Sequence, residues 1–110
     1  AAAQENLTVK RAKSLIHEFY GDGITLDEIA HKLGITPEYL STQFRKETGD
    51  TFSNYIRDFR IKKSKELLLG TQLKLHQISA QIGYSDPKYF SQVFKKAVGQ
   101  LPADYRKTRK

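Results

Sequence analysis

The chain has 110 residues and a formal net charge of +7, and 38% of its residues are hydrophobic. This length suits one domain or two small subdomains, and the composition is typical of a globular chain rather than a disordered one. No apolar run approaches the ~20 residues of a membrane span. The chain has no cysteine, which excludes disulfides and thiol chemistry and fits the reducing cytoplasm, where we expect the protein to reside.

The charge is distributed unevenly along the chain. Residues 1–50 contain six basic and eight acidic residues, whereas residues 51–110 contain thirteen and four. A polyanionic partner would explain this asymmetry, and so would a basic surface kept for solubility. Charge alone does not decide between the two.

Helical periodicity without any alternating strand pattern predicts an all-α fold of about seven helices. We interpret residues 1–6 as non-native residues or linker, and we interpret the chain as a fragment of a longer protein because methionine is absent. A first helix is expected from about Leu7 to Tyr20, ending at the glycines of residues 21–23. Its inward face is expected to carry these residues: Leu7, Ala12, Leu15, Ile16 and Phe19.

Capping signals predict where the next helices begin. Thr25 and Glu28 form a capping-box pattern at the start of a second helix, which ends near Gly34. Thr36 and Asp86 each precede a proline, as N-cap residues often do, and therefore begin the third and sixth helices. Gly49 and Gly99 end those two helices.

One long helix, residues 52–69, is expected to connect the two parts of the chain, and a last helix is expected over residues 102–107. The 18 residues of the connecting helix span ~27 Å at ~1.5 Å per residue. Successive major-groove faces of B-DNA lie ~34 Å apart. A helix of this length with a packed unit at each end can therefore hold two recognition helices at nearly that distance. The inward face is expected to carry these residues: Phe52, Tyr55, Ile56, Phe59, Ser64, Leu67 and Leu68.

The chain contains one helix-turn-helix pattern twice, in residues 25–49 and 75–99. The repeated pairs are Leu26 and Leu75, Ile29 and Ile78, Gly34 and Gly83, Pro37 and Pro87, Tyr39 and Tyr89, Ser41 and Ser91, Phe44 and Phe94, Lys46 and Lys96, Gly49 and Gly99, and Tyr55 and Tyr105. Up to the glycine of the turn, each residue of the second copy lies 49 positions after its equivalent in the first copy. From the proline onward the separation is 50 positions, so the second turn has one more residue. A duplicated unit in a basic chain suggests two contacts, one helical turn apart, on one duplex.

The two copies present similar outer faces. If Leu40, Phe44, Phe90 and Phe94 point inward, an outer arc remains on each of the third and sixth helices. These arcs consist of Glu38, Ser41, Thr42 and Arg45 in the first copy and Lys88, Ser91, Gln92 and Lys95 in the second. Such side chains suit base-edge and phosphate contacts in a major groove. One polar helix face would more simply be solvated surface, but two copies on a shared scaffold favour DNA.

Glu38 has two alternative roles on this arc. It could accept a hydrogen bond from a cytosine amino group, or it could complement the helix dipole at the second helical position. We favour the dipole role on sequence alone.

The ordered residues Ile78–Lys96, followed by Gly99, Pro102, Tyr105 and Arg106, resemble the AraC/XylS family of bacterial transcription regulators. The resemblance extends over Thr8–Lys107 and implies two helix-turn-helix units around a connecting helix. It implies that the base contacts are Glu38, Ser41, Thr42, Lys88, Tyr89, Ser91 and Gln92. We assign phosphate contacts to Arg45, Lys46, Lys95, Lys96 and Arg106, with Lys107, Arg109 and Lys110 as phosphate contacts or a frayed tail.

Two residues depart from the family pattern. Leu101 replaces the usual Ser or Thr cap before the last helix, and Ser79 stands where Ala is usual. The wider family joins this domain to a metabolite-sensing domain or to the receiver domain of a two-component system. We therefore expect RNA polymerase as a partner through the full-length protein, and a monomeric fragment.

Other chemistry has little support in the sequence. His17, His31 and His76 lack metal-ligand spacing, and no nucleophile with a neighbouring base or glycine-rich phosphate loop is found. We expect no enzyme activity, no cofactor and no metal. The predicted function is sequence-specific binding of double-stranded DNA by a transcription regulator, and the alternative is a helical protein-interaction module that has lost DNA binding.

Overall fold

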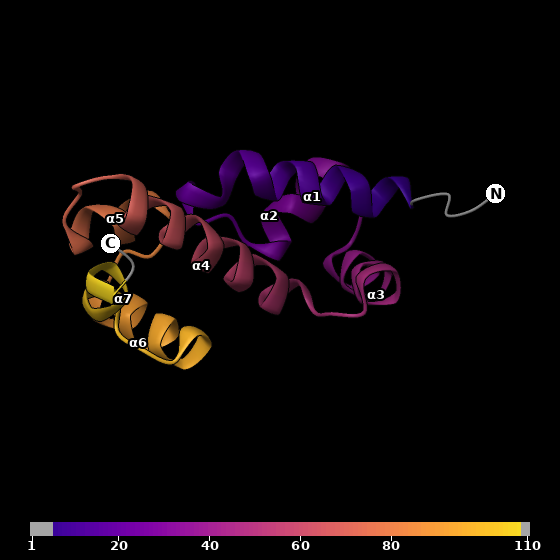
Figure 1. Ribbon diagram of the computed structural model, residues 1–110. Coiled ribbons are helices and arrows are strands. Elements are labelled where there is room, and N and C mark those ends of the chain that lie inside the picture. The colour runs from indigo at the N-terminus through magenta and orange to yellow at the C-terminus, as the bar shows by residue number, and fades with distance from the viewer. Residues whose placement is uncertain (1–5, 109–110) are drawn as a thin grey trace. The chain divides into compact units, whose positions relative to one another are not determined.

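The structure, a computed structural model, describes residues 6–108, which form α-helices and one short 3-10 helix (Figure 1). No strand occurs within this range, so the all-α prediction is confirmed. The elements are α1 (Leu7–Phe19), η1 (Tyr20–Asp22), α2 (Leu26–Leu33), α3 (Pro37–Thr48), α4 (Phe52–Gly70), α5 (Leu75–Gln81), α6 (Pro87–Val98) and α7 (Pro102–Thr108). Residues 1–5, interpreted above as linker, and the basic residues Arg109 and Lys110 lie outside the described part.

The chain divides into two compact units. Within the described residues, unit 1 comprises 6–20 and 24–57, and unit 2 comprises 21–23 and 58–108. Helix α4 therefore begins in unit 1 and ends in unit 2. Each unit contains one helix-turn-helix, formed by α2 and α3 in unit 1 and by α5 and α6 in unit 2.

In unit 1 the helices α1, α2 and α3 pack on one another (Figure 1). The buried apolar side chains of this unit are Val9, Ala12, Ile16, Ile24, Ile29, Ala30, Leu40, Phe44, Phe52 and Ile56. The expectation that Leu7 points inward is wrong, because its side chain is 57% exposed. The buried stripe of α1 follows the helical spacing of Val9, Ala12 and Ile16, which places Leu7 off that face.

The start of α1 is tied to α3. Asn6, assigned to the linker by the sequence analysis, is the N-cap of α1, and its side-chain oxygen accepts from the backbone N–H groups of Thr8 and Val9. Its Nδ2 donates to Gln43 Oε1 at 2.8 Å, and its backbone N–H donates to Glu47 Oε1 at 3.1 Å. The first residue described thus joins α1 to the second half of α3.

The capping box that the sequence predicts at the start of α2 is confirmed. Thr25 Oγ1 accepts from the backbone N–H of Glu28 at 3.2 Å, and Glu28 Oε1 accepts from the backbone N–H of Thr25 at 3.1 Å. Ile24 and Ile29, which flank this cap, are both buried. This pair has the spacing of a hydrophobic staple, which fixes how the chain enters α2.

Unit 2 is built around α6, which packs on α5 and α7. Its buried side chains are Ile61, Ser64, Leu68, Ile78, Ser79, Ile82, Phe90, Phe94, Pro102 and Tyr105. Helix α4 buries Phe52, Ile56, Ser64 and Leu68 as expected. Ile61, which was not expected in its inward face, is also buried, whereas Tyr55, Phe59 and Leu67 are only half-buried.

The two units repeat one aromatic contact. Phe44 and Tyr55 of unit 1 meet edge to face with ring centroids 5.1 Å apart, and Phe94 and Tyr105 of unit 2 do so at 5.5 Å. Both pairs obey the same offset of 50 residues in the sequence. Such pairs add about 0.5–1.5 kcal/mol to the stability provided by burial. The duplication seen in the sequence is therefore also a duplication of core packing.

Candidate nucleic-acid interface

Helix α3 presents a polar face to solvent. Thr36 Oγ1 caps the helix by accepting from the backbone N–H of Tyr39 at 3.1 Å, and Pro37 occupies its first position. Leu40 and Phe44 are fully buried, so the opposite arc of the helix is exposed. The exposed residues are those predicted to contact DNA from this helix: Glu38, Ser41, Thr42, Arg45 and Lys46.

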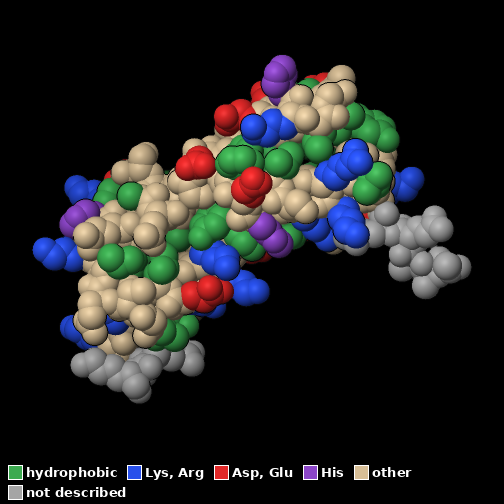
Figure 2. All heavy atoms as spheres, turned by 90° about the horizontal axis from the view of Figure 1, so that it is seen from above, with side chains coloured by type: hydrophobic (Ala, Val, Ile, Leu, Met, Phe, Trp, Pro, Cys, Tyr) green, Lys and Arg blue, Asp and Glu red, His purple; other side chains and the backbone are tan. Residues whose placement is uncertain are grey.

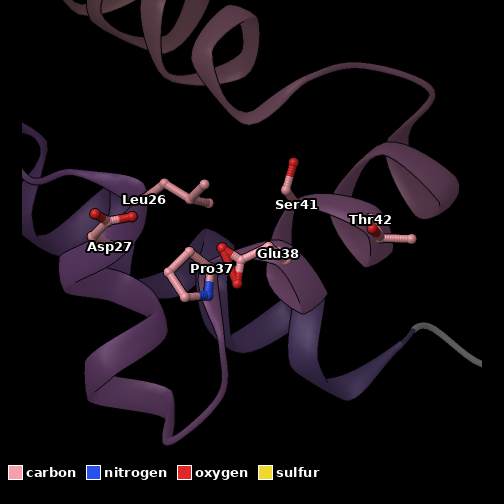
Figure 3. A pocket seen from close by; sticks show the side chains of 6 residues that line it. All are labelled: Leu26, Asp27, Pro37, Glu38, Ser41 and Thr42. Atoms are coloured by element: carbon pink, nitrogen blue, oxygen red, sulfur yellow. The ribbon is translucent and has the colours of Figure 1, made fainter.

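An open hollow of about 470 Å³ lies beside the start of α3 (Figure 3). It is lined by Leu26 and Asp27 of α2 and by Pro37, Glu38, Ser41 and Thr42 of α3. Leu26 and Pro37 are half-buried, whereas the polar lining residues are exposed. The structure thus brings all three base-contacting candidates of the first unit to one hollow.

Helix α6 repeats this design with a different charge. Asp86 Oδ1 caps it by accepting from the backbone N–H of Lys88 at 3.0 Å, and Pro87 follows the cap. Phe90 and Phe94 are fully buried. The predicted DNA contacts Lys88, Tyr89, Gln92, Lys95 and Lys96 are exposed, and Ser91 is half-buried.

The ring of Tyr89 is supported by an aromatic cluster that the sequence did not indicate. Tyr84 meets Tyr89 edge to face at 5.7 Å between centroids and stacks on Phe90 at 6.1 Å. The guanidinium of Arg60 lies 5.3 Å from the Tyr84 ring centroid, and its buried Nε has no hydrogen-bond partner in the described part of the chain. A cation over an aromatic face is attracted by the ring quadrupole. Tyr84 therefore contacts both the exposed ring of Tyr89 and the guanidinium of Arg60.

Each helix-turn-helix turn contains an equivalent backbone hydrogen bond, although the two turns differ in length. Ile35 donates its backbone N–H to the carbonyl of Ala30 at 3.0 Å, and Tyr84 donates to the carbonyl of Ser79 at 2.9 Å. In the second turn the buried Ser79 hydroxyl also donates to the Tyr84 carbonyl at 2.6 Å. Ser79 therefore stabilises the turn of unit 2.

Arg106, predicted as a phosphate contact, makes two hydrogen bonds inside the protein. Its Nε donates to the carbonyl of Leu68 at 2.9 Å, and one of its terminal nitrogens donates to the carbonyl of Thr71 at 3.2 Å. Leu68 lies in the last turn of α4, where helical carbonyl groups lack intrahelical partners, and Thr71 is the first residue after that helix. The half-buried side chain thus joins α7 to the end of α4.

The units differ in charge. Within the described residues, unit 1 contains seven basic and six acidic residues, whereas unit 2 contains ten basic and five acidic residues, which gives net charges of +1 and +5. On the face drawn in Figure 2, Lys and Arg side chains lie among acidic and hydrophobic ones. Electrostatic attraction to a polyanion therefore comes mainly from unit 2.

The histidines are candidate metal ligands by residue type, and one of them contacts Tyr55. Within residues 6–108, no group of three or more His, Cys, Asp or Glu side chains could hold a metal ion. His17 Nε2 lies 3.4 Å from the Tyr55 hydroxyl, and burial raises the pKa of that hydroxyl. No helix in this range is both long and apolar enough to cross a membrane.

Two short helices joined by a glycine turn, present once in each unit, define the chain as a double helix-turn-helix protein. A family model described as a helix-turn-helix domain matches residues 29–108. The chain is 37% identical over 99 residues to the Msm operon regulatory protein of Streptococcus mutans, a match that covers 90% of the chain and 36% of that protein.

Solved structures show the same fold. The C-terminal domain of AraT, a response regulator from Geobacillus stearothermophilus, superposes with a TM-score of 0.94 at 37% identity, covering 97% of this chain and 89% of that one. The DNA-binding domain of AdpA, solved in complex with a target DNA, superposes with a TM-score of 0.87 over 92% of this chain and 91% of that one. At 17% identity, the AdpA match shows the fold alone.

The chain belongs to this helix-turn-helix family and is a DNA-binding domain of the AraC/XylS type, a group of transcription regulators. It spans little more than a third of the Msm regulator, at 36% of that protein's length, and 12% and 38% of two other curated relatives.

Proposed function

We propose that the chain binds double-stranded DNA sequence-specifically, with α3 and α6 in adjacent major-groove segments. The observation that carries this proposal is the repeated design of the two helices. Each begins with a capped proline, buries two large apolar side chains and leaves a polar arc exposed. A recognition helix enters the major groove with its N-terminal residues against the base edges, which is where these arcs begin.

The side chains divide between base and phosphate contacts. Ser41, Thr42, Ser91 and Gln92 can hydrogen-bond to base edges, with Gln92 suited to adenine. The cations at the far ends of the helices, Arg45, Lys46, Lys95 and Lys96, are exposed and suited to phosphate. Tyr89 presents a fixed ring edge beside them. Arg106 takes the role of a positioning residue, because its guanidinium already serves the end of α4.

The whole protein is proposed to be a cytoplasmic bacterial transcription regulator that contacts RNA polymerase through its other parts. The likeness to the C-terminal domain of a response regulator supports a role as the output domain of a two-component system. We propose that the present chain binds DNA as a monomer and without catalytic activity, since its two helix-turn-helix units already provide two contacts.

Selection of bound sequences from random duplexes with this chain tests the proposal, followed by titration of the selected duplex at several salt concentrations. Four phosphate contacts predict a slope of log Kobs against log salt of about −3.6, at about −0.9 per contact. A protein-interaction module that has lost DNA binding would select no sequence and show no such slope.

Three variants compare the candidate base contacts of α6 with one of α3 in the same titration. Lys88→Ala and Gln92→Ala should weaken the selected duplex more than Ser41→Ala, because α6 carries the stronger positive charge. Each good base contact is worth about 1–3 kcal/mol of discrimination. If Gln92→Ala weakens random DNA as much as the selected duplex, Gln92 positions the protein and does not specify sequence.

A further inference from the structure

We infer that Glu38 selects the cytosine edge of a G·C pair, while Lys88 at the equivalent position of α6 selects the guanine edge. This inference rests on the proposed function and names what its two recognition helices select. Glu38 and Lys88 are both the second residue of their helix, directly after the capped proline. Both are exposed, and they carry opposite charges.

Unlike Glu28, Glu38 does not cap its helix. Glu28, in the neighbouring helix, shows what a capping glutamate does, since its Oε1 accepts from both the backbone N–H and the hydroxyl of Thr25. Within residues 6–108, no hydrogen bond or ion pair occupies the carboxylate of Glu38. The cap of α3 is supplied by Thr36 alone.

The helix dipole does not account for this position. An acidic residue is stabilised at a helix N-terminus and a basic one is disfavoured there. The repeat places Lys88 at the equivalent position of α6, whose N-terminus already has the carboxylate of the N-cap Asp86, so the dipole does not require an acid at the second position. The charge of the second helical residue therefore differs between α3 and α6, although the two helices are otherwise built alike. This difference is expected if the DNA base that each helix contacts determines the charge.

The hollow around Glu38 matches cytosine better than the other bases (Figure 3). The carboxylates of Asp27 and Glu38 provide only acceptors, whereas the hydroxyls of Ser41 and Thr42 in the same hollow can donate or accept. A base that faces the carboxylates must therefore offer a donor, and only the amino groups of cytosine and adenine do so in the major groove. Adenine places its N7 acceptor beside that amino group, where it would face a carboxylate. Cytosine places its C5–H there, which suits the apolar walls formed by Leu26 and Pro37.

Lys88 has the opposite hydrogen-bonding character. Its ammonium provides donors and no acceptor, which suits the O6 and N7 acceptors of guanine. No acid lies in the first turn of α6 after the N-cap Asp86. Equivalent positions in the two units would therefore select opposite edges of a G·C pair.

Selection from random duplexes with wild type and Glu38→Gln tests this inference. A glutamine provides a donor and an acceptor and pairs with adenine N6 and N7. We expect wild type to prefer cytosine at one position of the first half-site by roughly 5- to 150-fold over the other bases. Glu38→Gln should shift that position, and no other, towards adenine.

Glu18→Gln is the matched control, because it removes the same charge from an exposed site on α1 in the same unit. It should leave the base preferences unchanged. Circular dichroism of each variant confirms that it folds. An unchanged base profile for a folded Glu38→Gln protein would overturn the inference while the proposed function stands. Failure of wild type to select any sequence would instead overturn the proposed function, and the inference with it.

Discussion

Gly21 lies where the chain has no room for a side chain. It is part of η1 but belongs to unit 2, where it packs against the C-terminal end of α5. A Cβ on Gly21 would lie 2.5 Å from the carbonyl oxygen of Gln81 and 3.7 Å from its carbonyl carbon. Since the obstructing atom is backbone, no rotamer change relieves the contact. The Gly21→Ala variant must therefore displace η1 or the end of α5.

Two opposing effects set the magnitude. Overpacking of this kind costs about 1–3 kcal/mol. Replacing glycine by alanine also restricts the unfolded chain, which stabilises the fold by about 0.4–1 kcal/mol. We therefore expect Gly21→Ala to lower the free energy of unfolding by about 1–2 kcal/mol. Each kcal/mol lowers the Tm by about 3–6 °C for a chain of this size.

Urea and thermal unfolding followed by circular dichroism measure this change. Gly70→Ala is the matched control, because a Cβ at Gly70, the last residue of α4, meets nothing within 4 Å. That variant should gain about 0.4–1 kcal/mol. Equal free energies of unfolding for Gly21→Ala and Gly70→Ala would contradict the close approach of Gly21 to the Gln81 carbonyl.

Arg106→Ala should lower the free energy of unfolding by about 1–2 kcal/mol, because two charge-assisted hydrogen bonds to the end of α4 are lost from a half-exposed site. It should leave the salt slope of DNA binding unchanged, whereas loss of a phosphate contact would reduce that slope by about 0.9. Tyr55 makes stability depend on alkaline pH: burial raises its pKa in the folded chain above 10.0, so its contribution is complete below pH 10.0 and falls as pH rises through the folded pKa. Denaturation in urea at several alkaline pH values should show wild type losing stability relative to Tyr55→Phe, and parallel curves would contradict the burial of this hydroxyl.

The sequence predicts the features that depend on neighbouring residues. The caps of α2, α3 and α6 lie where Thr25, Thr36 and Asp86 indicate them, because a cap is a hydrogen bond between residues two or three positions apart. The duplication identifies Phe44 with Phe94 and Tyr55 with Tyr105 as equivalent positions, but the contact within each unit became evident only from the structure.

Contacts between distant residues were not predictable in this way. Arg106 reaches carbonyl groups 38 and 35 residues earlier in the chain, so its pattern in the sequence is the same whether it contacts protein or phosphate. The close approach of Gly21 to Gln81 also has no local signature. Ser79 could be identified as a departure from the family pattern, but its hydrogen bond to Tyr84 depends on the conformation of the turn.

Hydroxyl-radical footprinting of the chain on its selected duplex tests most directly whether both helix-turn-helix units contact DNA. We expect two protected segments on one face of the duplex, about 10 base pairs apart. Lys95→Ala should weaken protection in the segment contacted by α6 and leave the positions of both segments unchanged. A single protected segment, or uniform protection along the duplex, would contradict the claim that α3 and α6 each occupy a major groove.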